Sequence, residues 1–283
     1  MLCEPENQFS LPHAALSTSG RAKGKFLSLR LWSAATLATL SLCAQANADL
    51  LHRYSFTDGT ANDSVGGANG SLMGGAVVSD HAVQFNGTGA YVALPGPTVA
   101  INTYTSVTLE MWLTVNPGTY GGYAAAAAFG RTASDGIGRQ YLSLITPLYG
   151  GGAWAAITPD FWNVERIVRA GQFGYGQEQY VAITVDSSYL SCFLDGSLAG
   201  RTWLGGVALS DLSNELAYLG RSLYAGDMYE VGSINEFRIW NNALSADQVA
   251  ADTIAGPNVI PEPCAPALFG VGAGTLLLRR RRA

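Results

Sequence analysis

Apolar and polar residues alternate in a strict two-residue rhythm over residues 107–113. Every second residue from Val107 onwards is aliphatic or methionine, and Thr108, Glu110 and Trp112 stand between them. Successive side chains of a strand point to opposite faces of a sheet, whereas a helix repeats every 3.6 residues. This run therefore predicts a β-strand with one face turned to a hydrophobic core.

Similar short runs recur between glycine-rich turns through the middle of the chain. Residues 180–185 and 189–194 are two such runs, and Asp186-Ser187-Ser188 between them is typical of a turn. Two later strands are predicted at 216–219 and 234–240.

One helix is predicted, close to the end of this region. Ser245 is a suitable N-cap and Gln248 stands at the capping-box position, while Gly256-Pro257 ends the helix. Many short strands with one short C-terminal helix predict an all-β fold. We expect a single jelly-roll domain over residues 49–258, built as a two-sheet antiparallel β-sandwich.

The N-terminal 48 residues have the layout of a signal peptide with an extension before it. An apolar run of 14 residues at 31–44 is followed by Ala46-Asn47-Ala48, and four basic residues precede the run, namely Arg21, Lys23, Lys25 and Arg30. This order predicts secretion, with a mature chain that begins near Asp49. A buried helix or a retained anchor is the alternative, but the run is shorter than the roughly 20 residues that span a bilayer.

Residues 259–283 contain three ordered parts. Pro261, Glu262 and Pro263 precede an apolar stretch at 264–278, and four arginines follow it: Arg279, Arg280, Arg281 and Arg282. This order resembles the PEP-CTERM sorting signal of Gram-negative bacteria. The resemblance implies a transient inner-membrane anchor, processing by an exosortase, and delivery to the cell surface or extracellular matrix. A plain tail anchor is the alternative, with its arginines on the cytoplasmic side.

Charge is unevenly distributed along the chain. The whole sequence has a formal net charge of −5, but residues 49–260 hold eight arginines, no lysine and 18 acidic residues, a net charge of −10. A nucleic-acid-binding domain would need a basic surface, so this class is excluded. Cys192 is the one cysteine of this region and is typical of a small buried hydrophobic residue rather than a catalytic thiol.

A set of motifs in this acidic region is recognisable as a family pattern. In chain order they are LHRYSF at 51–56, VQFNG at 83–87 before Tyr91-Val92, VTLEMW at 107–112, a hairpin at 181–186 and 193–196, and GSINEFRIW at 232–240 followed by ALS at 243–245. Together they resemble LamG-like jelly-roll domains of the concanavalin A-like lectin/glucanase superfamily. The resemblance implies two antiparallel sheets packed face to face, often with one calcium ion.

The resemblance also indicates where calcium would bind. The candidate ligands are oxygen-bearing residues near the start of the domain and the pair that stands where the family has Asp-Glu: Asp58, Asn62, Asp63, Asn235 and Glu236. Calcium needs several oxygen ligands, and Asn235 supplies an oxygen without a charge, so weaker binding is expected. The alternative is that Asp58 and Asn62 simply form turns.

The sequence lacks the carboxylate pattern of the superfamily's enzymes. Its laminarinase-type glycoside hydrolases carry E-x-D-x-x-E on one strand, but here Glu110 stands alone and no Asp lies between Glu230 and Glu236. His52 and His81 are the only histidines of residues 49–260, and nothing resembles a Ser-His-Asp triad. We therefore expect a non-enzymatic domain with Glu236 in a structural or metal-binding role; a glycoside hydrolase is the less favoured alternative.

Aromatic residues in poorly periodic, glycine-rich segments are the candidate ligand contacts: Tyr149, Trp154, Phe161 and Trp162. Exposed aromatic side chains can stack on sugar rings or on a protein partner. The alternative is that they cover the core, as expected for Trp112 and Trp240 on predicted strands. The sequence thus predicts a secreted module that binds a polysaccharide or matrix component; a purely structural matrix protein is the rival interpretation.

Overall fold

The computed structural model describes residues 48–118, 122–147 and 152–260. The predicted signal peptide, apart from its last residue, lies outside this range. So do the sorting segment from Pro261 onwards and Tyr149. No helix in the described part of the chain is both long enough and apolar enough to span a membrane.

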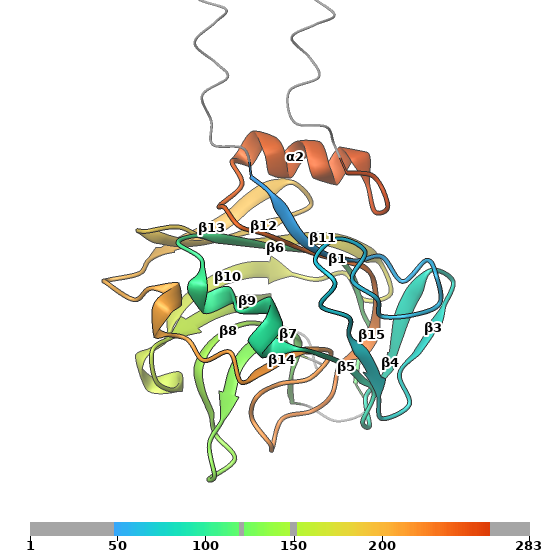
Figure 1. The fold of residues 1–283 in the computed structure, drawn as a ribbon, viewed down its shortest axis with the longest axis horizontal. Helices are drawn as coiled ribbons and strands as arrows, with labels where there is room; N and C mark the ends of the chain where they lie inside the picture. Colours follow the sequence, from blue (N-terminus) through green and yellow to red (C-terminus); the bar gives the residue numbers. More distant parts are fainter. Residues whose placement is uncertain (1–47, 119–121, 148–151, 261–283) are drawn as a thin grey trace, which may run out of the picture. The chain divides into compact units, whose positions relative to one another are not determined.

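Two antiparallel sheets form the predicted sandwich (Figure 1). Sheet A contains β1 (Leu50–Tyr54), β3 (Val77–Ser79), β4 (Ala82–Asn86), β6 (Val107–Val115), β11 (Glu178–Val185), β12 (Tyr189–Leu194), β13 (Ser197–Trp203) and β15 (Val231–Trp240), in the order β13-β12-β11-β6-β15-β4-β3 with β1 also paired to β15. Sheet B contains β2 (Ser71–Met73), β5 (Tyr91–Leu94), β7 (Tyr123–Thr132), β8 (Gly138–Pro147), β9 (Gly152–Thr158), β10 (Arg166–Gln172) and β14 (Leu216–Leu219), in the order β10-β9-β8-β7-β14-β5-β2.

The core lies between the two sheets. Leu109, Met111 and Leu113 of β6 belong to it and are fully buried, which confirms the alternation predicted for this strand. Phe237 of β15 stacks on Phe129 of β7 with ring centroids 6.2 Å apart, so an aromatic contact joins sheet A to sheet B. Burying each large apolar side chain stabilises the fold by about 1.5–3 kcal/mol.

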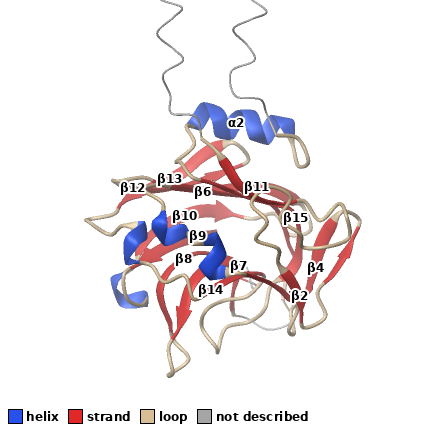
Figure 2. Ribbon diagram, in the orientation of Figure 1, coloured by secondary structure: helices blue, strands red, loops and turns tan. Residues whose placement is uncertain are grey.

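The helix α2 (Ala246–Ala255) covers the outer face of sheet A, where the outer face of a sheet is the side that points away from the other sheet (Figure 2). Ser245 and Gln248 form the predicted capping box. Val249 of the helix packs in one buried cluster with Trp112 and Trp240. The two tryptophans are therefore packing residues, as their strand positions predicted.

Other short elements connect the strands: α1 (Gly96–Val99) and 3₁₀ turns at Ile101–Thr103, Trp162–Val164 and Leu209–Asp211. Cys192 is buried and free in β12, and burial raises the pKa of its thiol to about 12. A thiol with this pKa carries almost no reactive thiolate at neutral pH, in agreement with its interpretation as a small hydrophobic residue.

Candidate functional site

Asp58 and Asn62, two of the predicted calcium ligands, lie together in an exposed turn. The Asp58 carboxylate accepts hydrogen bonds from the Thr60 hydroxyl at 2.7 Å, from the Thr60 backbone N–H at 2.9 Å and from the Asn62 amide at 3.2 Å. Chiefly through the Thr60 hydroxyl, these bonds hold the pKa of Asp58 below its usual value. They are the bonds with which an Asp commonly organises a turn.

Asp63 organises the loop that follows β1. Its carboxylate accepts a hydrogen bond from Nδ1 of His52 at 2.7 Å and others from the backbone N–H groups of Arg53, Gly66 and Ala68 at 2.9–3.0 Å. Burial acts to raise the pKa of Asp63, but these donors outweigh burial and lower it. The carboxylate is thus fully used in holding the loop against β1.

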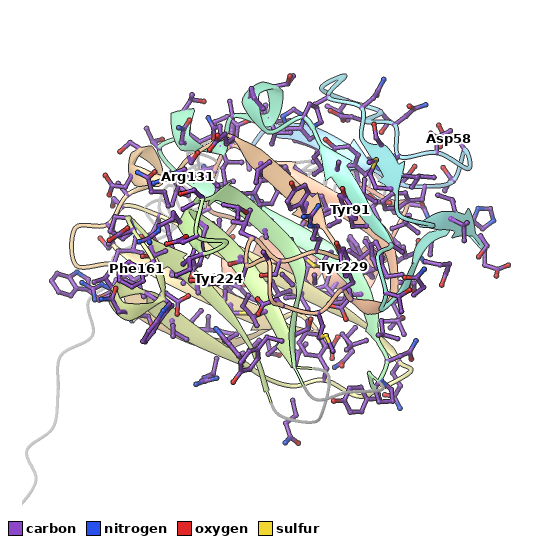
Figure 3. All side chains as sticks on the ribbon, turned by 90° about the horizontal axis from the view of Figure 1, so that it is seen from below. Asp58, Tyr91, Arg131, Phe161, Tyr224 and Tyr229 are labelled. Carbon is purple, nitrogen blue, oxygen red and sulfur yellow. The ribbon has the colours of Figure 1, made fainter. Side chains whose placement is uncertain are left out.

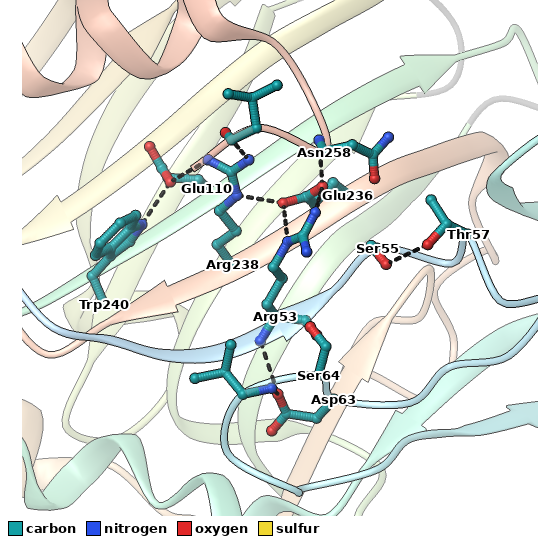
Figure 4. A network of polar contacts seen from close by, with 12 residues as sticks. Arg53, Ser55, Thr57, Asp63, Ser64, Glu110, Glu236, Arg238, Trp240 and Asn258 are labelled. Atoms are coloured by element: carbon teal, nitrogen blue, oxygen red, sulfur yellow. Dashed lines mark hydrogen bonds and ion pairs between the residues drawn. The ribbon is translucent and has the colours of Figure 1, made fainter. Parts of the chain in front are cut away.

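Glu236 lies at the centre of a buried ionic network on the outer face of sheet A (Figure 4). Its carboxylate accepts hydrogen bonds from Arg53 Nε at 2.8 Å, Arg53 Nη2 at 3.0 Å, Arg238 Nε at 2.5 Å and the backbone N–H of Asn258 at 2.6 Å. Burial acts to raise the pKa of Glu236, yet the two guanidinium groups hold it below its usual value. The segment after α2 is thereby fastened to β15.

Glu110 extends this network beneath α2. It accepts a hydrogen bond from the indole N–H of Trp240 at 2.6 Å and another from the Tyr180 hydroxyl, and it lies 3.8 Å from Nη1 of Arg238. Burial and the negative charge of Asp252 on α2 raise the pKa of Glu110 to about 8. Glu110 is also completely buried, so it does not act as a solvent-accessible base.

The hydrogen bonds described above do not join the five predicted calcium ligands into one group of side chains that could coordinate an ion. Asp63 and Glu236 both contact Arg53, one through its backbone and the other through its guanidinium. The amide of Asn235 donates to Glu178 at 3.1 Å. The described residues contain no group of three or more His, Cys, Asp or Glu arranged to hold a metal ion. Held between two arginines, Glu236 does not fit a calcium ligand.

Calcium binding therefore stays a prediction that rests on the exposed turn at Asp58 and Asn62. Millimolar calcium is expected to raise the melting temperature if this turn holds an ion, because a ligand that binds only the folded state stabilises it. Asp58→Ala should remove the rise, and Glu215→Ala, which removes an exposed carboxylate outside the set, should retain it. A wild-type melting temperature that does not respond to calcium would reject the prediction.

The outer face of sheet B carries aromatic side chains from several strands. Figure 3 labels Tyr91 of β5 and, from the segment that follows β14, Tyr224 and Tyr229. Tyr141 of β8, Trp154 of β9 and Tyr218 of β14 lie in or against a hydrophobic cluster that is separate from the core. Tyr91 of β5 meets Tyr218 edge to face, with ring centroids 5.3 Å apart. Among the described residues no α-helix contributes to this cluster, in contrast to the outer face of sheet A.

A loop at residues 220–230 lies across the middle of this face. Its base is closed by an antiparallel bridge between Arg221 and Tyr229. Leu223 packs on Ala125 and Ala128 of β7, and all three are almost completely buried. The small side chains of Ala125 and Ala128 thus let the loop approach the sheet closely, whereas Ala126 and Ala127 belong to the core between the sheets.

The predicted ligand contacts are divided between two places. Trp154 lies near the beginning of β9, edge to face with Tyr123 and beneath the guanidinium of Arg169. Phe161 and Trp162 follow the end of the same strand and contact each other edge to face. Trp162 is 62% exposed. These residues therefore do not form one continuous platform, and Tyr149 lies outside the described residues.

A family model described as "Concanavalin A-like lectin/glucanases superfamily" matches residues 86–250, which is more than half of the chain. The chain belongs to this superfamily. The match includes the motifs at 107–112, 181–196 and 232–245, whereas the motif at 51–56 and most of that at 83–87 lie before it. No curated protein compared with the chain is significantly similar to it.

Solved structures show the same fold at low sequence identity. Domain 4 of AbnA, a GH43 extracellular arabinanase from Geobacillus stearothermophilus in complex with arabinotriose, is 19% identical with a TM-score of 0.58; the match covers 73% of this chain and 98% of that one. The Ruminococcus gnavus IT-sialidase CBM40 bound to α2,3-sialyllactose is 14% identical with a TM-score of 0.51, covering 60% and 95%. The binding domain of botulinum neurotoxin DC in complex with rat synaptotagmin II is 13% identical with a TM-score of 0.55, covering 71% and 50%.

Several aromatic residues on the outer face of sheet B in this concanavalin A-like domain were not predicted as ligand contacts. Tyr218 alternates with the core residues Ala217 and Leu219, so its strand pattern alone could have placed it outside. Tyr229 and Arg221 have no such signal, because the 220–230 loop that pairs them has no regular period. Only the tertiary structure brings them beside Tyr91.

Proposed function

We propose that this concanavalin A-like domain binds carbohydrate, without catalysis, through the outer face of sheet B and the loops at its ends. The observation that carries the proposal is a set of partly exposed aromatic side chains on this face, namely Tyr91, Trp154 and Tyr218. The opposite side of the sandwich is closed by α2. Aromatic rings that are fixed in place and partly exposed suit stacking on sugar rings, because they offer apolar surface at little conformational cost.

The structural relatives support a glycan as the partner. Two of them are complexes with arabinotriose and with sialyllactose, and a further botulinum neurotoxin DC binding domain is in complex with SialylT. These proteins share only the fold with this chain. The proposal that the chain binds a glycan therefore rests on the aromatic face as well as on these relatives.

The three glutamates compared with the enzymes' carboxylate pattern support a non-catalytic role. Glycoside hydrolysis needs two carboxyl groups that flank the bond to be cleaved. Glu110, Glu230 and Glu236 are completely buried and do not reach a bound sugar. Glu165, near the aromatic cluster, accepts a hydrogen bond from the Tyr141 hydroxyl, and burial raises its pKa.

The role of the predicted aromatic contacts is tested by the double variant Trp154→Ala/Trp162→Ala. We expect it to bind the producer's own polysaccharide at least about tenfold more weakly, since truncating a central aromatic contact costs more than about 1 kcal/mol. Retention on the immobilised polysaccharide and a glycan array measure the effect. Trp203→Ala is the matched control, because Trp203 is 68% exposed but lies on β13 of sheet A.

Two outcomes would contradict the proposal. Unchanged retention of a folded double variant would reject Trp154 and Trp162 as contacts. A wild-type protein that binds no glycan on the array would instead favour the purely structural matrix protein.

We also propose that the protein is exported and delivered to the cell surface or extracellular matrix by an exosortase. This proposal rests on the sequence of residues 1–48 and 259–283. The net charge of −10 on the region between them supports it, since a strongly charged domain stays soluble outside the cell.

A further inference from the structure

Arg221 lies among three tyrosine rings on the outer face of sheet B. Its guanidinium carbon is 4.7 Å from the ring centroid of Tyr91, 4.8 Å from that of Tyr218 and 5.8 Å from that of Tyr229. The rings come from β5, from β14 and from the end of the 220–230 loop, and Figure 3 labels two of them. Contacts of this kind attract the cation to the ring faces and fix its position.

The guanidinium of Arg221 has no acidic partner within the described residues. The two acids of its own loop are engaged elsewhere: Asp227 accepts a hydrogen bond from Ser222 at 2.6 Å, and Glu230 accepts one from Thr146. Arg53, Arg139 and Arg238 of the same domain are all paired with carboxylates. Arg221 therefore combines a fixed position with unused hydrogen-bond donors.

We propose that Arg221 binds the carboxylate of an acidic sugar residue, with Tyr91, Tyr218 and Tyr229 lining the position of that residue. This inference rests on the proposed carbohydrate binding and adds the chemical class of the ligand. A guanidinium presents its N–H donors in a planar fork that matches a carboxylate. Because three rings already hold the fork, little side-chain entropy is lost when the carboxylate arrives.

The tyrosines add contacts to the rest of the sugar. Each ring is half-buried, so part of its surface and its hydroxyl can face a ligand. Burial raises the pKa of Tyr218, and its hydroxyl stays protonated and able to donate a hydrogen bond. The net charge of −10 between residues 49 and 260 disfavours densely charged polyanions of any kind, so a short oligosaccharide with an isolated carboxylate is the better match.

The proposal is tested with two pairs of probes that differ in a carboxylate: tetragalacturonate against its methyl ester, and 3′-sialyllactose against lactose. Binding to the purified full chain is measured by calorimetry. We expect at least one acidic probe to bind more tightly than its neutral counterpart, and the two pairs distinguish a uronic acid from a sialic acid. The preference should weaken as salt is added, because the contact is ionic.

Arg221→Gln should weaken binding of the preferred acidic probe about 10- to 100-fold, as expected for loss of a charge-assisted contact, and leave its neutral counterpart unaffected. Arg221→Lys should restore only part of the affinity, since an ammonium lacks the planar fork. Arg201→Gln is the matched control, because Arg201 stacks on the single ring of Tyr189 at the far edge of sheet A. Melting temperatures establish that each variant is folded.

The outcomes separate this inference from the proposed function. If the wild-type protein binds a neutral probe as tightly as the acidic one, or if folded Arg221→Gln retains full affinity, the carboxylate contact is wrong while carbohydrate binding stands. Preference for a sulfated galactan over both acidic probes would also overturn it. If the protein binds none of these probes and no glycan on the array, the proposed function itself fails.

Discussion

Glu236→Ala is expected to destabilise the domain by about 3–5 kcal/mol, the usual cost of removing one partner from a buried ion pair. The substitution leaves Arg238, whose side chain is 0% exposed, without the carboxylate that neutralises it. It also frees Arg53 and removes the acceptor for the backbone N–H of Asn258. Chemical denaturation followed by tryptophan fluorescence measures the change in the free energy of unfolding.

Two further variants make the Glu236 prediction specific. Arg53→Ala should cost less, because its side chain is 18% exposed and Glu236 keeps its contact with Arg238. Glu215→Ala removes an exposed carboxylate and should change stability by less than about 0.5 kcal/mol. If Glu236→Ala does not fold, Glu236→Gln removes the same charge but keeps the size of the side chain and one oxygen acceptor. A Glu236→Ala protein within about 1 kcal/mol of the wild type would contradict the role assigned to the network.

The stability of the domain should fall by several kcal/mol as the pH rises from about 5 to 8. Burial raises the pKa of Glu230 to about 7 from an ordinary value of 4.5. The folded state then keeps a proton that the unfolded state releases, so the free energy of unfolding decreases with pH across this window. The difference corresponds to roughly 3 kcal/mol for Glu230. Glu110, with its pKa raised to about 8, acts in the same direction.

Other carboxylates limit stability at low pH. The pKa values of Asp63 and Glu236 are lowered in the folded state, so the stability they contribute is present above their ordinary pKa values and is lost as the pH falls through the lowered ones. The two opposite trends place the maximum of stability near pH 5.

Glu230→Gln tests the assignment of the pH dependence. Glutamine keeps an oxygen that can accept the hydrogen bond from Thr146, but it does not titrate. The variant should therefore lose less stability than the wild type between pH 5 and 8. Denaturation curves at a series of pH values measure this difference, with Glu215→Gln as the exposed control. Parallel pH profiles of Glu230→Gln and the wild type would contradict the role of Glu230.

The strands were predicted from short-range pattern, because each signal lies within a few residues. Alternation over 107–113 and the turn at 186–188 correspond to β6 and the β11–β12 hairpin. The cap at Ser245 set the beginning of α2. What this pattern did not predict is that Glu110, on the polar side of β6, is also buried, because the covering helix is contributed by residues more than 130 positions later.

The candidate site could be predicted only in part from the sequence, because its residues too come from distant parts of the chain. Trp154 and Trp162 stood out as aromatic residues in an irregular segment, and the structure places Trp154 on the outer face of sheet B and Trp162 just beyond the end of β9. Arg221 and its three tyrosines come from positions 91 to 229. They lie side by side because β14 pairs with β5 and because the Arg221–Tyr229 bridge closes the 220–230 loop.

The sequence by itself determined the fold class, the superfamily resemblance and the expectation that the domain is not an enzyme, because these depend on local periodicity, motifs and the absence of a required carboxylate pattern. Only the tertiary structure decided which charges neutralise one another and which remain available. Glu236 pairs with two arginines, whereas Arg221 has aromatic neighbours and, in the part of the chain that the structure describes, no acidic partner. The physical reason is that ionic pairing acts over a few ångströms in space, whatever the separation of the residues along the chain.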